Sequence, residues 1–525
     1  MANTHTIAKN SAWYGIETAI GFAVTIFTSV AIARTLGPSK MGYIIYVTWI
    51  ASIVSSLGAL GVPATTRKYM AEFLGAGDKG TARHIYFRTL LMQAGLATVV
   101  TSGLLFWVLR DAGSGYALAS GLIALSIWPS MVNSISAQAN VAAEELSANL
   151  PASVASILVF FVAIACTVVF RWGVVGVGAA MLLMRMVDFL VRFLPTARRI
   201  SLWPQVRSDQ SRLGQRMTIF AWQSVATMVV ALIVWDRSEF FLLKHLCSDI
   251  RQVAYYSVAF SMAERLLISA SVFSSATGAT IFAQYGRDKS KLSAIVASAF
   301  RYLFLTSVPL HAIASALATP ALMLLYGNQY KDAAAVVTLA PLLCLPKAFI
   351  DPIQNLLQSS ERQGHVILAT VIAGIADLSV AWYLIPAHGA VGACIGSGVA
   401  QVVALGILWA IGIHDYGVKL PWLCIAKVAV ASSIASLAAH FIAIQCSPVW
   451  GIVLGGSTSV AVVILLFRGL HVLDATDRDR FALLTVKLPK RLAVPVDATL
   501  LFLTGPPDKP YQNLESLQQT VVNGE

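Results

Sequence analysis

Charge is scarce in this sequence. Only 12% of the 525 residues are Asp, Glu, Lys or Arg, whereas 57% are hydrophobic, and mean hydropathy is +0.73. Soluble globular chains carry about twice that charged fraction, so the composition excludes them and indicates a polytopic membrane protein. Long polar stretches are also missing before residue 470. The chain therefore has no room there for a folded soluble catalytic domain.

Cysteine is sparse as well. The six cysteines stand singly in or near apolar segments, without CxxC or Cys/His spacing. We therefore expect no disulfide framework, no metal site and no cofactor. The net charge of +12 could indicate nucleic acid, but the basic residues fall mostly in short loops between apolar runs. We interpret them as positive-inside topology beside anionic lipid and expect no nucleic-acid partner.

Apolar runs of about 20 residues are what the chain has in abundance. With the N-terminus inside, the loops on the inner side hold about twice as many Lys and Arg residues as the opposite loops, which predicts that both termini are cytoplasmic. Fourteen runs are predicted to span the membrane: 12–34, 41–63, 88–109, 117–140, 148–170, 173–196, 217–236, 254–283, 296–318, 333–357, 364–386, 389–412, 421–444 and 449–467.

Two segments echo each other along the chain. Ala71–Lys79 reads AEFLGAGDK, and Ala283–Lys289 reads AQYGRDK. An even number of predicted spans separates them, so both would lie on the same side of the membrane, as in transporters built from parallel repeats. The most basic connector, 196–216, falls where two six-helix lobes would join.

These patterns predict an all-α polytopic membrane protein with about fourteen transmembrane helices. Twelve of them would form two six-helix lobes in parallel repeat, and two would follow at the C-terminal end. In the tail, Thr476 can cap a short helix with Phe481, Leu484 and Leu488 on one face, which we expect to lie on the inner leaflet. The predicted divisions are an N-terminal lobe over 1–212, a C-terminal lobe over 213–412, two further transmembrane helices over 413–468 and a cytoplasmic tail over 469–525.

Short segments at span boundaries follow one another in a characteristic order: Ala33–Pro38, Gly42–Tyr43, Arg67–Tyr69, Asp236–Arg237, Tyr255–Ser257, Leu325–Tyr330 and Ile385–Ala393. Together they resemble the polysaccharide flippase family, the oligosaccharidyl-lipid branch of the superfamily that also contains the multidrug and toxic-compound extrusion transporters. The resemblance implies two lobes that alternate access around a polar cavity. It also implies movement of an undecaprenyl-pyrophosphate-linked oligosaccharide from the inner to the outer leaflet of a bacterial cytoplasmic membrane.

Charged side chains inside the predicted spans are the candidate functional residues. A charge at the bilayer centre costs roughly 2.5–3.5 kcal/mol on insertion scales, so such groups pair or face a cavity. Glu264 and Arg265 lie near the middle of the eighth span, and adjacent helix positions point about 100° apart, so the two cannot simply neutralise each other. Cavity lining and an interhelical bridge are both open. Asp377 has no charged neighbour at helical spacing and is either a proton or cation carrier or a satisfied buried carboxylate.

Three further groups of residues complete the candidates. Arg185, Asp188 and Arg192 form a ladder on one face of the sixth span, for which we favour a structural role, although a cationic stripe would also suit a pyrophosphate. Lys347 and Asp351 can pair at i, i+4 among three prolines that should kink the tenth span, as a hinge or a site. By resemblance the first and seventh spans line the cavity, which adds Glu17, Gln223, Asp236 and Arg237.

The sequence thus predicts a transporter and not an enzyme. We expect Arg265, with Arg237 or Arg185, to contact the pyrophosphate, and Glu264 or Asp377 to couple the cycle to a cation gradient. The expected partners are a lipid-linked oligosaccharide, membrane lipids and polysaccharide polymerase machinery. A lipid II flippase or a drug/cation antiporter of the same superfamily remains an alternative. A membrane glycan polymerase or ligase is less favoured, because the longest outer loop, about 237–253, offers only Glu239, His245 and Asp249 for acid/base chemistry.

Overall fold

The computed structural model describes residues 4–111, 115–200, 211–235 and 238–473, together with Asp477, Phe502 and Thr504. Regular structure in these ranges is helical throughout, and twelve helices within them are long and apolar enough to cross a membrane. This confirms the predicted fold class. The predicted tail helix, the pair Asp236–Arg237 and the side chain of Glu17 lie outside the described part.

The helices follow the predicted spans closely. The N-terminal half contains α1 Thr4–Gly58, α2 Val62–Gly75, α3 Lys79–Asp111, α4 Ala117–Leu125, α5 Ile127–Ala142, η1 Leu146–Asn149, α6 Leu150–Val169, α7 Gly173–Ile200, α8 Ser211–Trp235 and α9 Glu239–Leu246. The C-terminal half contains α10 Arg251–Arg287, η2 Lys289–Lys291, α11 Leu292–Ala316, α12 Ala318–Tyr326, η3 Asn328–Ala333, α13 Ala334–Cys344, η4 Leu345–Phe349, α14 Ile350–Ser359, α15 Gln363–His388, α16 Ala390–Tyr416, α17 Trp422–Gln445 and α18 Pro448–Gly469.

Glycine and proline set the breaks within these helices. The first two predicted spans join in α1, which kinks at Gly37, where φ is +72° and Pro38 follows. A left-handed backbone suits glycine, and proline cannot donate the next helical hydrogen bond. The tenth predicted span divides into α13, η4 and α14, with Pro346 in η4, so the predicted proline break is confirmed.

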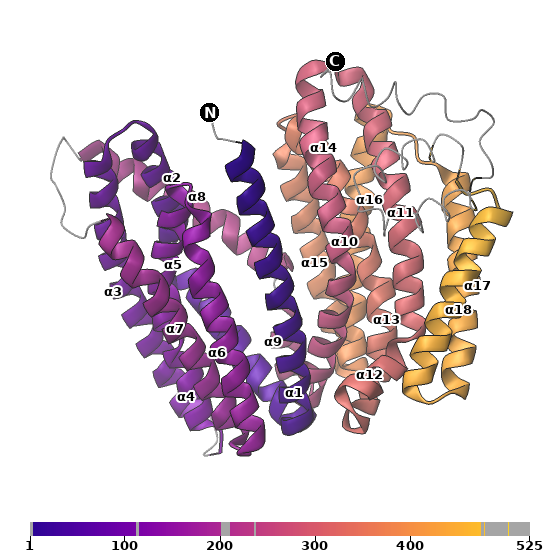
Figure 1. The fold of residues 1–525 in the computed structure, drawn as a ribbon, viewed down its shortest axis with the longest axis horizontal. Coiled ribbons are helices and arrows are strands. Elements are labelled where there is room, and N and C mark those ends of the chain that lie inside the picture. Colours follow the sequence, from indigo (N-terminus) through magenta and orange to yellow (C-terminus); the bar gives the residue numbers. More distant parts are fainter. Residues whose placement is uncertain are drawn as a thin grey trace. The chain divides into compact units, whose positions relative to one another are not determined.

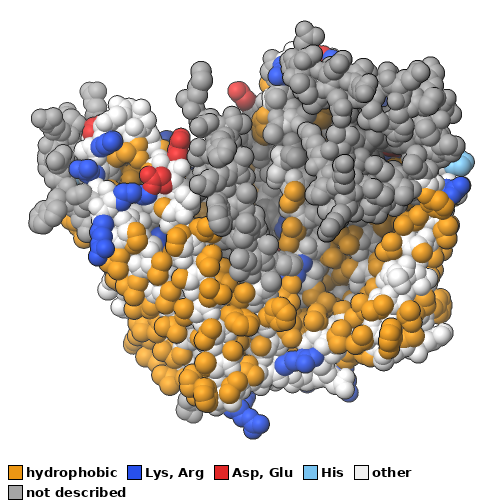
Figure 2. All heavy atoms as spheres, in the orientation of Figure 1, with side chains coloured by type: hydrophobic (Ala, Val, Ile, Leu, Met, Phe, Trp, Pro, Cys, Tyr) orange, Lys and Arg blue, Asp and Glu red, His pale blue; other side chains and the backbone are white. Residues whose placement is uncertain are grey.

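The chain divides into two compact units by its internal contacts. The first comprises 1–260, 325–336 and 367–403. In it the helices α2 to α7 form a bundle (Figure 1), in which small residues let backbones approach: a Cβ on Gly178 of α7 would lie 2.7 Å from the carbonyl oxygen of Ala119 in α4. Hydrophobic side chains cover the flank of this bundle, with Lys and Arg gathered towards its margins (Figure 2).

The second unit comprises 261–324, 337–366 and 404–525. Here α18 packs on α17 through Gly451 and Gly455, whose Cβ positions would meet the carbonyl oxygens of Ala443 and Ala439 at 3.1 and 3.0 Å. Close approach over small residues is a common way for membrane helices to associate. In the same unit, aromatic rings from three elements that are distant in sequence, α11, η4 and α16, contact one another: Phe300, Phe304, Phe349 and Trp409. The predicted lobe boundaries stay a prediction. The two units are defined by internal contacts, and each combines segments from both halves of the chain.

The echoed segments share a local structure. In the first copy, Asp78 accepts hydrogen bonds from the Thr81 backbone N–H at 3.0 Å and from its hydroxyl at 2.6 Å, at the start of α3. In the second copy, Asp288 accepts the same pair of bonds from Ser290, at 3.0 and 2.6 Å, before α11. Asp78 therefore caps α3, and Asp288 caps η2, the short helix that precedes α11, since each carboxylate satisfies a backbone donor left free at a helix start.

Candidate functional site

A buried pair of carboxyl groups lies in the first unit. Glu239 occupies the first turn of α9, and Asp377 lies in the middle of α15; each side chain is only 3% exposed. The two carboxyl groups lie close enough to interact with each other. Two ionised carboxylates at close range repel each other, so an apolar site that holds both favours a shared proton or a bound cation.

The walls of this site are close and specific. Tyr256 of α10 is fully buried, and its hydroxyl lies beside Glu239. From α16, Gly396 faces the other carboxyl, since a Cβ there would lie 2.9 Å from Asp377 Oδ1 and 3.0 Å from the Ala381 side chain. That same Oδ1 atom has no hydrogen-bond partner among the described residues. An oxygen ligand thus remains available in the site.

This arrangement suits binding of a proton or a small cation. Two acids side by side in an apolar region repel strongly when both are ionised, so they retain a proton or take a cation between them. Release of that ion leaves an unfavourable negative charge. Binding of the ion is therefore linked to the conformational equilibrium of the protein, because the ion stabilises the conformation that buries the two acids.

The kink in α1 is held by a distant part of the chain. Arg34 Nε donates to the carbonyl oxygen of Leu325 at 2.7 Å, and Gln329 Nε2 donates to the carbonyl oxygen of Arg34 at 3.0 Å. We call this contact, between Ala33–Gly37 and Leu325–Tyr330, the α1–η3 junction. Both segments of this junction carry the family resemblance. Their contact with each other gives one structural explanation for the two motifs.

A second contact of this type lies close to the acidic pair in sequence. Gln252 Oε1, at the start of α10, accepts a hydrogen bond from the backbone N–H of Ala390 at 2.9 Å. Gly389, with φ of +54°, makes room for that side chain, because a Cβ on Gly389 would lie 2.5 Å from Gln252 Oε1. The turn between α15 and α16 is therefore fixed to α10.

The other predicted site residues are distributed over both units. Glu264 and Arg265 are half-buried on α10 and belong to the second unit, as do Lys347 and Asp351. Asp351 lies within electrostatic range of Lys347, across the η4 break. Gln223 on α8 and Arg185 on α7 are exposed. Glu17, Asp236 and Arg237 fall outside the described side chains, so their predicted roles stay predictions.

The predicted ladder on α7 forms a polar network within the N-terminal bundle. Arg192 donates to Asp188 at 2.6 Å, and Asn133 of α5 donates to the same carboxylate at 2.7 Å. Arg192 also reaches the Ser153 hydroxyl of α6 at 3.3 Å. The network joins α5, α6 and α7, which agrees with the structural role we favoured for Asp188 and Arg192.

Sequence reasoning missed Glu239 as a partner of Asp377. Glu239 is the first residue of an apolar octet, EFFLLKHL, that follows a predicted span, and the sequence places it in an outer loop. The octet is too apolar for a solvated loop, and this could have indicated that its acid is buried. Helical spacing could not reveal the pairing, because 138 positions separate the two residues.

Comparison with known proteins concerns the fold. No protein-family model matches the chain, and no curated sequence matches it. Among solved structures, the lipid II flippase MurJ in an inward closed conformation is similar with a TM-score of 0.66 and 12% identity, over 86% of this chain and 97% of that one.

Multidrug transporters share the same architecture. A MATE family transporter of the MOP superfamily in an inward-facing conformation has a TM-score of 0.63 and 15% identity, over 77% of this chain and 98% of that one. An outward-facing MATE structure has a TM-score of 0.55 and 17% identity, over 78% of this chain and 96% of that one. The chain thus has the fold of MOP superfamily transporters.

Proposed function

We propose that the protein is a flippase that moves an undecaprenyl-pyrophosphate-linked oligosaccharide across the bacterial cytoplasmic membrane for surface or exopolysaccharide biosynthesis. Transport by alternating access is supported by the fold, which drug exporters and a lipid II flippase share. The observation that carries the proposal is the buried Glu239–Asp377 pair, two acids held together in an apolar part of a fold of this type. Both termini would face the cytoplasm.

Coupling follows from the chemistry of the pair. A cation or proton that neutralises Asp377 and Glu239 stabilises the conformation in which the two acids are buried, by its differential affinity for that conformation. Entry and exit of the ion on opposite sides of the membrane would then drive the cycle. Of the two predicted coupling groups, Asp377 is therefore favoured over Glu264.

An anionic lipid substrate is favoured by a cation deep in the membrane region. Arg265 is fourteen residues into α10, about 21 Å along its axis from Arg251, and is half-buried. A guanidinium binds phosphate with paired, charge-assisted hydrogen bonds. We therefore assign Arg265 to the pyrophosphate, with Arg185 or Arg237 as supporting contacts. The polymerase machinery that consumes the translocated glycan would be its neighbour.

The test is translocation of a lipid-linked glycan in reconstituted vesicles, with Arg265→Ala beside the unchanged protein. Loss of translocation with the fold retained supports the assignment; unchanged translocation refutes the role of Arg265. A glycan that emerges with altered covalent structure would instead support a polymerase or ligase. Translocation of lipid II or of a cationic drug, and not of the oligosaccharide lipid, would support the corresponding alternative.

A further inference from the structure

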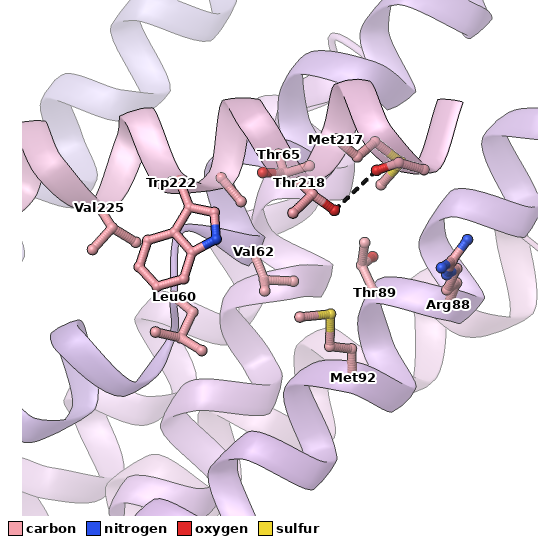
Figure 3. Close-up of a pocket in the computed structure, with 12 residues that line it drawn as sticks. Leu60, Val62, Thr65, Arg88, Thr89, Met92, Met217, Thr218, Trp222 and Val225 are labelled. Carbon is pink, nitrogen blue, oxygen red and sulfur yellow. Dashed lines mark hydrogen bonds between the residues drawn. The ribbon is translucent and has the colours of Figure 1, made fainter. Parts of the chain in front are cut away.

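A cavity in the first unit lies away from the acidic pair. It has a volume of about 220 Å³ and lies between the start of α2, the first half of α3 and the first half of α8 (Figure 3). Its walls are largely apolar, with Leu60, Val62 and Met92 on one side and Ala221, Trp222 and Val225 on the other. Met92 and Trp222 are 50% and 64% exposed, so the cavity opens at the surface of the unit.

The hydroxyl groups in the lining are already used. The hydroxyl of Thr65 donates to the Gly61 carbonyl at 2.9 Å, that of Thr89 to Ile85 at 2.8 Å, and that of Thr218 to Gly214 at 3.0 Å. A buried water needs two to four polar partners. Few remain here, so the cavity favours an apolar occupant. An apolar cavity of roughly 150 Å³ is large enough to bind benzene, and this one is larger.

One charged side chain lines the cavity. Arg88 is exposed at one end, opposite Leu60 and Trp222 (Figure 3), and has no ion-pair partner among the described residues. Its guanidinium lies over the start of α8, since a Cβ on Gly214 would be 3.9 Å from Arg88 Nη1. The occupant should therefore be an amphiphile with an apolar chain and an anionic head.

Further cations lie on the same helices. Lys68 of α2 sits 3.9 Å above the ring of Phe220 in α8, and Arg216 of α8 lies 3.0 Å from Glu72. Arg67 and Arg83 add positive charge to α2 and α3. Clustered basic side chains beside a membrane attract anionic lipid.

We propose that this cavity binds one acyl chain of an anionic membrane phospholipid, whose phosphate contacts Arg88, and that the lipid joins α8 to α2 and α3. A phospholipid is favoured over a scarcer polyprenyl lipid by mass action, because phospholipid is the solvent of the membrane. The bound lipid fills a gap beside α8, which packs within this unit mainly on α2 and α1. Neither acid of the Glu239–Asp377 pair lines this cavity.

The experiment counts retained lipid by native mass spectrometry. The full chain, purified in detergent, is mixed with palmitoyl-oleoyl phosphatidylglycerol, with phosphatidylcholine of the same chains, or with undecaprenyl phosphate. We expect phosphatidylglycerol to bind about tenfold more tightly than phosphatidylcholine, because both carry the phosphate but the choline cation of phosphatidylcholine is repelled by Arg88 and the neighbouring basic side chains. Arg88→Gln should remove the preference. Arg110→Gln makes the same charge change about 33 Å away along α3 and should retain it.

The apolar part of the site has its own control. Met92→Trp fills the cavity and should lower binding of both phospholipids, whereas Val99→Trp, at a position on α3 that is 71% exposed and outside the cavity, should not. Equal binding of the two phospholipids to the unchanged protein would overturn the proposal. So would a preference that survives Arg88→Gln, or tighter binding of undecaprenyl phosphate than of phosphatidylglycerol at this site. If Met92→Trp fails to fold, the Arg88→Gln comparison decides.

Discussion

The single residue that the sequence located best is Asp377. An acid in an apolar run is recognisable because a charge in the membrane is costly. Its partner, Glu239, was not recognisable, because nothing in the spacing of α9 and α15 reports that they meet. The cost of burying a charge thus predicts which residues need a partner, whereas helix packing determines which residue that partner is.

The acidic pair predicts cation-dependent stability. Neutralising either acid in Asp377→Asn or Glu239→Gln should remove the stabilisation that a bound cation gives, which for any ligand at a hundred times its Kd is about 2.7 kcal/mol. Melting of the purified protein across Na⁺ and pH series measures this. Asp332→Asn, at an exposed acid of the same unit, is the matched control and should keep the response. A full cation response in Asp377→Asn would contradict the site.

Gly396 makes a sterically explicit prediction. Gly396→Ala places a methyl group 2.9 Å from Asp377 Oδ1, so it should destabilise the protein by about 1–3 kcal/mol and weaken the cation response. Gly406→Ala, on the same helix with nothing within 4 Å of its Cβ position, should be close to neutral. Melting of the two variants side by side tests the difference, and equal effects would refute close packing at Asp377.

At the scale of elements, hydropathy predicted the helices well. The physical reason is that the bilayer demands apolar helices of a fixed length, so composition alone reveals them. Shorter features followed different rules. The sequence predicted the proline break at η4, but neither the separate helix α9 nor the break at Leu60–Gly61 before α2, where both residues have positive φ. Those depend on contacts with neighbouring helices.

The caps of α3 and of η2 should respond to pH in the same way. The hydrogen bonds from Thr81 and from Ser290 hold the pKa of Asp78 and of Asp288 below the ordinary value. Each cap is therefore fully formed above a pH of about 3.9 and is lost as pH falls through the lower folded value. Hydrogen exchange in the first turn of α3 should rise in Asp78→Ala but not in Asp288→Ala, and the reverse should hold for η2. Uniform changes in both turns would contradict local capping.

A buried ion pair joins Asp477 to α11. The Asp477 side chain is 1% exposed and accepts hydrogen bonds from Arg301 of α11 at 2.7 and 3.2 Å and from the Tyr302 hydroxyl at 2.9 Å. Breaking one side of a buried pair costs about 3–5 kcal/mol. Asp477→Ala should therefore lower the melting temperature of the purified protein. A melting temperature equal to that of the unchanged protein would show that this pair does not stabilise the fold.

At the scale of the whole molecule, the superfamily fold was predictable and its internal contacts were not. The motifs at Ala33–Pro38 and Leu325–Tyr330 each have a local explanation in helix ends, and only the structure shows them bonded to each other. Contacts between distant segments arise from packing, and a single sequence does not reveal which segments pack together. The same reason explains why the cavity at Arg88 could not be foreseen.

The α1–η3 junction predicts a conformational requirement. If the transport cycle alternates access, segments joined across the two halves of the chain have to separate in one of its states. In a background without the six free cysteines, a short bismaleimide bridging Ala33→Cys and Gln329→Cys should arrest transport, and cleavable reagent should restore it. Transport that continues at full rate with the bridge in place would show that the junction stays closed throughout.

Ion-coupled translocation of a lipid-linked oligosaccharide can be measured in vesicles. Vesicles containing the purified protein and a fluorescent undecaprenyl-pyrophosphate oligosaccharide are given a cation gradient, and the glycan that becomes accessible on the opposite leaflet is followed over time. We predict covalently unchanged glycan on the far side, at a rate that the gradient raises and that Asp377→Asn abolishes. Absence of translocation by the unchanged protein, or translocation that Asp377→Asn leaves intact, would contradict it.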